Sequence, residues 1–534
     1  MKLFRRALIL LHRYLGIALS ALFVMWFATG IAMMYAREMP RLTAEMRLNR
    51  LSPVDLGAVR LTPAEAVQRA DWDGAPPRAT LLTVMDRPAY RFGGRDSVTV
   101  FADTGDLLDT VGADKAKTVA SRFMQLPDSQ LTYVATLSRP DQWTLQQRMP
   151  VHKFTVDDQD ATELYVSEHT AEVTVMTTRR SRLLAWIGAI PHWLYFAPLR
   201  INGEVWRQVV LWTSGLGIAL ALFGIVLGIV QLRISRPFRL SRIGSYLPYS
   251  GSMRWHYIAG LVFGLFTLTW VFSGWLSMEP WGWATNAGVQ GGGLRAAFTG
   301  APGALADFPS FSHPGWSAVS DRAEIKEIEF VRIQDKPVLV VHRQPDEAAR
   351  TEIRGHQPYF ADRSKDPARL LIDAATLQAR HEPFSAESLL ARVRTALPDT
   401  PVIESAMLDA YDSYYYSRDG AAPLPVLRVK LGDDDRTWLY IDPLMSQLVA
   451  RIHRLDRVER WLYNGMHSLD FAFWYTRRPL WDVGMIALSL GGFTVSALGF
   501  YLGLRRLRRG AQRALAAPAI PRDEATRRAA PTRA

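Results

Sequence analysis

Four stretches of the chain lack any aspartate, glutamate, lysine or arginine, and they constrain the fold more than any other feature. They are Tyr14–Ala36, Gln208–Leu232, Trp255–Met278 and Val483–Leu504, each 22–25 residues long. A helix needs about 20 apolar residues to cross roughly 30 Å of hydrocarbon. The sequence therefore predicts four transmembrane helices. The first stretch follows "MKLFRR", but it is long for a signal peptide and no clear cleavage site follows it, so we expect a retained anchor.

The basic residues predict how the chain is oriented. Much of the net charge of +12 lies in three short segments beside the apolar stretches. With four crossings these segments share one side, which the positive-inside rule makes cytoplasmic, together with both termini. The segments contain Lys2, Arg5, Arg6 and Arg13; Arg233, Arg236, Arg239, Arg242 and Arg254; and Arg505, Arg506, Arg508 and Arg509. Contact with membrane lipid thus explains the charge, and nucleic-acid binding is not expected.

The chain contains no cysteine. This excludes disulfides, thiolate metal sites, iron–sulfur clusters and covalent c-type haem attachment. No Walker A motif or dinucleotide-binding fingerprint is present either.

The sequence repeats itself in register, which predicts a duplicated architecture. An offset of 244 places His12 on His256, Trp26 on Trp270 and Thr29-Gly30 on Ser273-Gly274. An offset of 275 places His192 on His467 and Trp206 on Trp481. Both halves enter the membrane in the same sense, so we expect a parallel repeat about an axis along the membrane normal.

The fold class that follows is a membrane protein. We expect a four-helix transmembrane bundle, built by parallel duplication, with two α+β extracytoplasmic domains. The predicted segments are helix 1 (1–37), domain 1 (38–180), an interfacial helix with His192 (181–204), helix 2 (205–233), a basic cytoplasmic loop (234–253), helix 3 (254–279), domain 2 (280–457), an interfacial helix with His467 (458–478), helix 4 (479–505) and a disordered cytoplasmic tail (506–534).

Short alternating strands joined by turns predict β-hairpins in both domains. The patterns are "SVTVFADTGDLLD" (97–109), "ELYVSEHTAEVTV" (163–175), "RLLIDAATLQAR" (369–380) and "TWLYIDPLMSQLVAR" (437–451). Thr62, with Glu65 three residues later, and Ser385 are predicted helix caps. "YDSYYY" (411–416) is either a strand with half its tyrosines buried or an aromatic ligand surface.

Four histidines are the candidate ligands of a cofactor. His12 and His256 lie near the cytoplasmic ends of their helices, and His192 and His467 precede helices that start outside. The duplication thus places two matched histidines at each face of the membrane, where they can form the axial pair of a haem. Interfacial anchoring is the alternative for any one of them, and zinc is disfavoured because neither pair has a carboxylate or cysteine nearby.

Neighbouring residues extend this prediction. Gly16 and Gly260, one turn from the inner histidines, leave room for a flat macrocycle, and Trp26 and Trp270 lie on the same helix stripe. Cationic side chains could bind propionates or simply reach the interface. They are Arg13 and Arg254 for the inner pair and Arg200, Arg477 and Arg478 for the outer pair.

Several of these segments together resemble the PepSY-associated transmembrane proteins. They are "HRYLGIALSALFVMWFATG", "PHWLYF", "WHYIAGLVFGLFTLTWVFSGW" and "MHSLDF". The resemblance covers about residues 1–509, and some members are ferric-siderophore reductases of the bacterial inner membrane. It implies PepSY-like periplasmic domains and b-type haem. The family's membrane histidines fall on His12, His192, His256 and His467.

The expected function is transfer of electrons across the inner membrane to a periplasmic ferric siderophore, with release of Fe(II). Two bis-histidine haems would serve this purpose, because iron with both axial positions filled passes electrons and does not bind substrate. The donor would be a quinol or a cytoplasmic or membrane reductase. Two other hypotheses are a permease or accessory factor for siderophore or haem without redox chemistry, and a membrane-anchored PepSY module that binds or regulates a partner.

Overall fold

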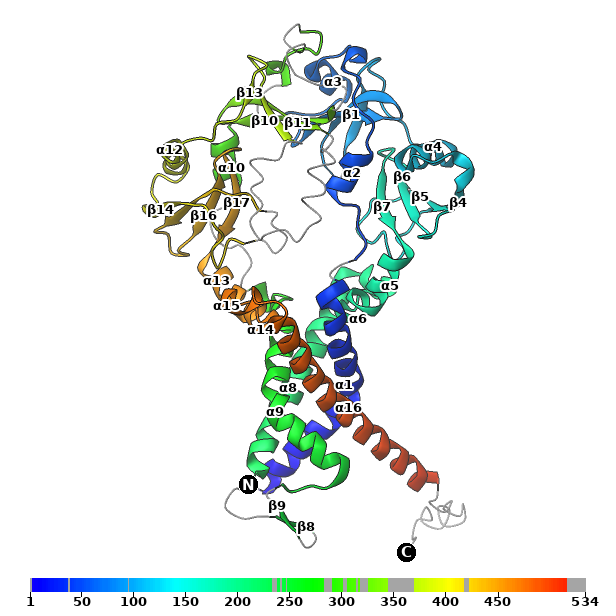
Figure 1. The fold of residues 1–534 in the computed structure, drawn as a ribbon, viewed down its shortest axis with the longest axis vertical. Coiled ribbons are helices and arrows are strands. Elements are labelled where there is room, and N and C mark those ends of the chain that lie inside the picture. The colour runs from blue at the N-terminus through cyan, green and yellow to red at the C-terminus, as the bar shows by residue number, and fades with distance from the viewer. Residues whose placement is uncertain are drawn as a thin grey trace, which may run out of the picture.

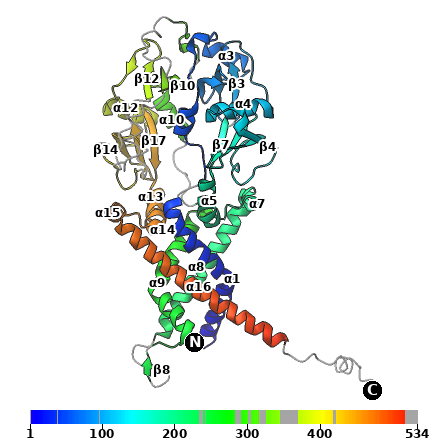
Figure 2. The same cartoon turned by 45° about the vertical axis from the view of Figure 1, so that its right-hand side comes forward.

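Four long helices form one end of the molecule. The computed structural model describes residues 2–36, 39–94, 96–232, 238–240, 243–245, 247–282, 291–300, 305–313, 316, 325–343, 369–416 and 422–515. Within these ranges four helices are long and apolar enough to cross a membrane, as predicted: α1 (Lys2–Ala36), α8 (Gly203–Gln231), α9 (Gly251–Leu276) and α16 (Leu480–Leu515). The seven-stranded sheet and the two four-stranded sheets lie together beyond one end of this bundle (Figures 1 and 2).

The bundle places α1 and α9 on a diagonal. Helix α1 packs against α8 and α16, and α9 packs against the same two helices. The N-terminus and the small hairpin β8 (Phe238–Leu240) and β9 (Ile243–Ser245), which lies between α8 and α9, occur at the end away from the large sheets (Figure 1). This is the arrangement that the charge pattern predicts for one side of a membrane.

Two predicted segment boundaries differ from the structure. Helix α16 continues to Leu515, so residues 506–515 of the predicted tail are helical, because this segment is rich in strong helix formers such as Ala, Leu and Arg. The rest of that tail, 516–534, lies outside the described residues. The predicted basic loop 234–253 contains the β8–β9 hairpin and the start of α9, and its residues 234–237, 241–242 and 246 also lie outside them.

The two long segments between membrane helices share one seven-stranded sheet. Its order is β13-β12-β11-β10-β1-β2-β3, with antiparallel pairing throughout. The first segment supplies β1 (Ala79–Val84), β2 (Arg87–Phe92) and β3 (Val98–Phe101). The second supplies β10 (Ile325–Ile333), β11 (Lys336–Arg343), β12 (Arg369–Asp373) and β13 (Ala379–Arg380). The predicted domains 38–180 and 280–457 therefore join through the β1–β10 pair.

Each segment also has its own four-stranded antiparallel sheet. The first contains β4 (Leu131–Leu137), β5 (Val151–Val156), β6 (Glu163–Ser167) and β7 (Val173–Thr177). The second contains β14 (Val402–Leu408), β15 (Val426–Leu431), β16 (Trp438–Asp442) and β17 (Gln447–Ile452). The β6–β7, β12–β13 and β16–β17 pairs confirm three predicted hairpins, and a Val100–Leu107 bridge follows β3 in the remaining one.

Short helices cover these sheets. Helix α4 (Ala113–Met124) places Ala116, Ala120 and Phe123 on one face, where they pack against the β4–β7 sheet. Helices α10 (Gly291–Thr299) and α12 (Ala386–Ala396) pack on β15 and β16 in the same way. Helices α2 (Ala44–Arg50) and α3 (Pro63–Arg69) complete the first segment. The predicted capping box of Thr62 and Glu65 and the Ser385 cap are both present.

The two predicted interfacial helices are broken into short pieces. One consists of α5 (Arg179–Ile187), α6 (Ala189–Trp193) and α7 (Ala197–Arg200). The other consists of α13 (Arg454–Arg460), a π-turn (Trp461–Gly465), α14 (Met466–Ser468) and α15 (Ala472–Tyr475). Both lie between the bundle and the sheets in Figures 1 and 2. In each segment one break follows the histidine, at a leucine with a left-handed backbone conformation. Helices α5 and α6 are separated at Gly188, before His192.

Candidate functional site: two pairs of facing histidines

The bundle brings the four predicted histidines together as two pairs. His12 on α1 and His256 on α9 face each other across the diagonal, with ring centroids 6.3 Å apart and an interplanar angle of 35°. His192 on α6 and His467 on α14 form the other pair, at 6.2 Å and 72°. We name these the inner pair and the outer pair. Of the other predicted site residues, Gly16, Trp26 and Arg13 lie on α1, and Gly260, Trp270 and Arg254 lie on α9.

All four histidines have their Nδ1 atom hydrogen-bonded to an oxygen of a long helix. In the inner pair the acceptors are the backbone carbonyls of Leu220 and Val495, both at 3.1 Å. Because a carbonyl can only accept, Nδ1 carries the hydrogen in both residues. The Nε2 lone pair is then available to a metal, which is how second-shell bonds orient histidine ligands.

The outer pair is oriented by hydroxyl groups instead. Thr29 accepts from His192 Nδ1 at 3.1 Å, and Ser273 accepts from His467 Nδ1 at 3.0 Å. Each hydroxyl donates its own hydrogen to a helix carbonyl, at 2.8 Å from Thr29 and 3.0 Å from Ser273. The hydroxyl oxygens are therefore acceptors toward the rings. Both Nε2 atoms are again left without a hydrogen.

The ring separations fit two ligands on opposite sides of one metal. An imidazole–metal bond is about 2 Å long, and a ring nitrogen lies about 1.2 Å from the ring centre, so imidazoles on opposite sides of a metal have centroids roughly 6.4 Å apart. In a tetrahedral site the same bonds give about 5 Å. The observed 6.3 and 6.2 Å match the trans arrangement. The residues therefore fit the axial positions of a haem iron better than a zinc site.

Glycines on neighbouring helices allow the rings to approach. A Cβ atom at Gly224 would lie 2.8 Å from Cε1 of His12, and one at Gly499 would lie 3.4 Å from Cε1 of His256. In the outer pair, Gly30 and Gly274 back the rings, with hypothetical Cβ atoms at 3.5 Å from His192 and 3.7 Å from His467. Glycine is thus required most strictly at Gly224, where any side chain would overlap the imidazole.

Two tryptophans fix the backbone beside the outer histidines. Trp206 Nε1 donates to the carbonyl of Trp193, which follows His192, at 2.8 Å. Trp481 Nε1 donates to the carbonyl of Ser468, which follows His467, at 3.1 Å. These bonds explain why a tryptophan stands fourteen residues after each outer histidine.

The same two turns contain leucines in the left-handed region. Leu194 has φ 54° and Leu469 has φ 47°, each two residues after its histidine. A non-glycine residue in such a conformation costs of order 1–3 kcal/mol and persists only when its surroundings fix it. Packing of Leu194, which is 9% exposed, and the tryptophan bonds provide that constraint. The turns are thus held in the shape that aims the histidines inward.

A cavity of about 720 Å³ adjoins the outer pair. This volume lies within the range of roughly 300–1,000 Å³ typical of small-molecule and cofactor sites. Aromatic and sulfur-containing side chains make most of its wall, and Glu459 and Arg478 add charge. Trp26 and Trp270, predicted on the stripes that start at the inner histidines, line this outer cavity.

Four of the predicted residues lie beside the inner histidines on α1 and α9. A Cβ at Gly260 would meet no protein atom within 4 Å, and one at Gly16 would lie 3.8 Å from the Leu220 side chain. Gly260 therefore borders open space, as predicted, whereas Gly16 packs on α8. Arg13 is half-buried and Arg254 is exposed. Their predicted contact with propionates stays a prediction.

Several residues that position the histidines were not predicted in that role. They occupy equivalent positions in the two halves of the sequence. At an offset of 244 the pair is Thr29 and Ser273. At an offset of 275 the pairs are Leu194 and Leu469, Trp206 and Trp481, Leu220 and Val495, and Gly224 and Gly499. The internal repeat was thus the sequence signal from which these positions could have been identified. Sequence alone gives no means to see that a carbonyl of Leu220 meets His12.

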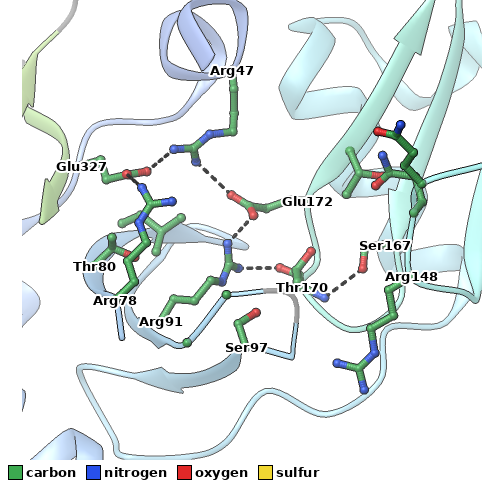
Figure 3. Close-up of a pocket in the computed structure, with 16 residues that line it drawn as sticks. Arg47, Arg78, Thr80, Arg91, Ser97, Arg148, Ser167, Thr170, Glu172 and Glu327 are labelled. Atoms are coloured by element: carbon green, nitrogen blue, oxygen red, sulfur yellow. Dashed lines mark hydrogen bonds and ion pairs between the residues drawn. The ribbon is translucent and has the colours of Figure 1, made fainter. Parts of the chain in front are cut away.

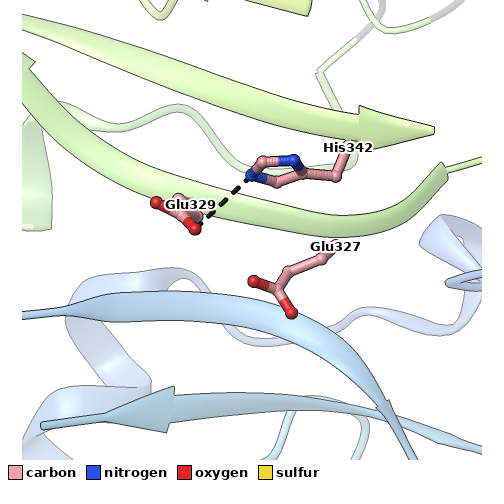
Figure 4. A group of neighbouring side chains, drawn as sticks. All are labelled: Glu327, Glu329 and His342. Atoms are coloured by element: carbon pink, nitrogen blue, oxygen red, sulfur yellow. Dashed lines mark ion pairs between the residues drawn. The ribbon is translucent and has the colours of Figure 1, made fainter. Parts of the chain in front are cut away.

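A second cluster of possible metal ligands lies in the seven-stranded sheet. Glu327, Glu329 and His342 have ligand atoms within 4.8 Å of one another (Figure 4). Arginines already neutralise both carboxylates, since Arg47 and Arg78 pair with Glu327, and Arg78 also contacts Glu329 at 2.8 Å. Burial raises the pKa of Glu329, but His342 and Arg78 outweigh it and lower that pKa to about 2. The cluster is therefore an ion-pair network and offers a divalent cation little unbalanced charge.

The tyrosines of "YDSYYY" contact neighbouring protein groups, and one of the four is buried. Tyr415 is 4% exposed and stacks on Tyr440 at 4.8 Å, and Tyr416 donates to Asp470 at 3.1 Å. Tyr411 donates to the carbonyl of Ala422. The predicted strand is thus wrong for this segment, because no strand covers residues 411–416 and only Tyr415 among its four tyrosines is buried. The aromatic ligand surface stays a prediction.

A family model described as "PepSY-associated TM region" covers residues 9–506. No curated protein matches the chain significantly.

Proposed function

Because the chain belongs to the PepSY-associated TM region family and is a multi-pass membrane protein, we propose that it is a haem-containing reductase of the bacterial inner membrane. It passes electrons from the cytoplasmic side, or from membrane quinol, to a ferric siderophore in the periplasm. The observation that carries the proposal is the separation of the rings in both histidine pairs, 6.3 and 6.2 Å between centroids, with every Nδ1 hydrogen-bonded.

The proposed roles of the side chains follow from the geometry. His12 and His256 would hold one haem b, and His192 and His467 the other. Haem b with two histidine ligands supplies one-electron transfer without an open iron position. The Nδ1 bonds fix the tautomer and ring direction of each ligand, and such second-shell bonds raise ligand basicity.

A two-site arrangement suits electron transfer across a bilayer. The inner pair lies within α1 and α9, and the outer pair lies at the end of the bundle that faces the sheets (Figure 1). The recurrence of their contacts at offsets of 244 and 275 supports an origin by duplication, which would give each face of the membrane its own equivalent site. Burying an ionisable side chain at membrane depth costs free energy, so the presence of four histidines there favours a functional role for them.

The substrate side of the proposal depends on the iron itself. Siderophores bind hard Fe(III) through oxygen ligands, and Fe(II) is held far more weakly. One electron delivered to the chelate therefore releases the metal, and no general acid or nucleophile is needed. The periplasmic location of the sheets and the cytoplasmic location of the termini are part of the proposal.

The test is an absorption spectrum of detergent-purified protein from haem-replete cells, with haem quantified per chain. We expect two haems in the wild type. His12→Ala and His256→Ala should each lose one haem, and their double variant should lose no more than one. His381→Ala, at an exposed histidine outside the bundle, is the matched control and should retain two.

The reductase step needs a separate assay. Dithionite-reduced protein, freed of excess dithionite, is mixed with ferric siderophores while the haem spectrum and an Fe(II) indicator are followed. Reoxidation of the haem with stoichiometric Fe(II) is expected. A colourless protein would favour the permease or regulatory alternatives, and a haem protein that no ferric chelate reoxidises would exclude the reductase activity.

A further inference from the structure

The sheet domains contain a second cavity, of about 360 Å³, whose wall includes none of the four paired histidines. It lies between the seven-stranded sheet and the β4–β7 sheet (Figure 3). Its wall includes four arginines and two glutamates, namely Arg47, Arg78, Arg91, Arg148, Glu172 and Glu327. We name this the arginine cavity.

Two of these arginines hold the cavity together. Arg47 on α2 pairs with Glu327 on β10 and with Glu172 before β7, the latter at 3.2 Å. Arg91 on β2 also pairs with Glu172 and donates to the carbonyl of Thr170 at 2.7 Å. Glu327 is 3% exposed as a side chain. These pairs connect both sheets and leave Arg47 and Arg91 little capacity for a ligand.

The other two arginines have donors to spare. Arg78 uses only Nη2, which contacts Glu327 at 3.2 Å and Glu329 at 2.8 Å. Arg148 has a 3.3 Å contact from Nη1 to Asp96, whose side chain is 84% exposed. Such exposed pairs contribute little. A guanidinium has five N–H donors in a planar fork, so Arg78 and Arg148, at 54% and 42% exposure, retain unshared donors at the cavity.

Neutral hydrogen-bonding groups fill much of the remaining wall. They are the hydroxyls of Ser97, Thr170 and Thr174 and the side-chain amides of Gln146 and Gln147. Together with forked guanidinium groups, such side chains match carboxylate and phosphate oxygens. A volume of about 360 Å³ admits a small ligand, near the lower limit for ligand sites.

From this arrangement we propose that the arginine cavity binds a small polyanion, one that carries two or more carboxylate or phosphate groups. Arg78 and Arg148 are its recognition residues, and Arg47, Arg91, Glu172 and Glu327 form its frame. The unshared N–H donors of Arg78 and Arg148 favour anionic oxygen atoms over neutral and cationic groups. Binding does not depend on the histidine pairs, so it can be tested in protein with or without haem.

The test is isothermal titration of the full-length protein in detergent at constant, low ionic strength. Citrate represents the carboxylates, pyrophosphate the phosphates and acetate a monoanion of the same chemistry. We expect one equivalent of citrate or pyrophosphate to bind at least tenfold more tightly than acetate. The tighter of the two identifies the preferred oxyanion.

Variants assign the binding to the cavity. Arg78→Gln and Arg148→Gln should each lower the affinity for the tighter-binding polyanion about tenfold, which is the value expected for the loss of one charge-assisted hydrogen bond. Ser97→Asp, which adds a negative charge without removing an ion pair, should weaken it as well. Arg60→Gln, at an exposed arginine outside the cavity, should bind like the wild type.

Three results would overturn the proposal. The first is that neither polyanion binds better than acetate. The second is that the Arg78, Arg148 and Ser97 variants all bind like the wild type, which would leave the arginines a purely structural role. The third is an equal loss in Arg60→Gln, which would indicate nonspecific charge attraction.

Discussion

Gly224→Ala should disrupt the inner site through a single methyl group. The new Cβ would lie 2.8 Å from Cε1 of His12 and 3.3 Å from its Nδ1, well inside the carbon–carbon optimum of about 3.5–4.0 Å. The ring cannot retreat without losing its 3.1 Å bond to Leu220. Overpacking of this kind costs about 1–3 kcal/mol, and each 1.4 kcal/mol weakens binding about tenfold.

The four ring-facing glycines provide a graded series for this prediction. The hypothetical Cβ distances are 2.8 Å at Gly224, 3.4 Å at Gly499, 3.5 Å at Gly30 and 3.7 Å at Gly274. Haem per chain and apparent haem affinity should therefore fall most in Gly224→Ala, slightly in Gly499→Ala, and least in the Gly30 and Gly274 variants. The thermal midpoint of the sheet domains should not change.

The assay is haem titration into protein produced under haem limitation, followed by the Soret band. Gly274→Ala is the matched control, because it adds the same methyl group to a helix at a distance of ordinary contact. Equal haem affinity in Gly224→Ala and wild type would refute the reasoning, as would an equal loss in Gly274→Ala.

Four further changes test other parts of the account. Gly260→Val should lower inner-haem occupancy although a Cβ there meets no protein atom within 4 Å; unchanged haem content would mean that the macrocycle does not use this space. Trp481→Phe should keep the ring packing but lose the hydrogen bond beside the outer histidine, so the outer haem's reduction potential or occupancy should shift while the inner haem's stays constant; a shift in both would contradict this. The pKa of Glu329 is lowered to about 2, against about 4.3 in an unfolded chain, so its ionised form stabilises the fold above pH 4.3 and this stability is lost as pH falls toward 2. The urea midpoint of unfolding should therefore fall less steeply between pH 4.3 and 2 in Glu329→Gln than in the wild type. Parallel curves for the two proteins would argue against the ion-pair network. Arg47→Ala removes a partner of a buried carboxylate and should lower the free energy of unfolding by about 3–5 kcal/mol. Arg122→Ala breaks an exposed ion pair and should lower it by under about 1 kcal/mol. Equal free energies of unfolding in the two variants would contradict the assigned burial.

Sequence patterns predicted the bundle and the histidine pairs because both are set by strong one-dimensional signals. Uncharged windows fix the membrane helices, and a histidine that recurs in register must occupy an equivalent place in each half. His12 and His256 were therefore predictable as a facing pair. The alternating hairpins were predictable for the same reason, since burial on one face imposes a period of two.

Contacts between distant segments were not predictable in this way. Nothing in the sequence around Leu82 indicates that its strand pairs with β10 and merges both domains into one sheet. The breaks after His192 and His467 arise from leucines in left-handed conformations, which local propensity opposes. Tertiary hydrogen bonds from Trp206 and Trp481 stabilise those turns, and such bonds become visible only in three dimensions.

Electron paramagnetic resonance of the oxidised protein, with haem quantified per chain, tests the central claim most directly. The orientation of the two imidazole planes sets the splitting of the iron d orbitals, so angles of 35° and 72° should give two different low-spin signals. We expect His256→Ala to remove one signal and His467→Ala the other. Protein without haem, or with only high-spin iron that these variants leave unchanged, would contradict the account.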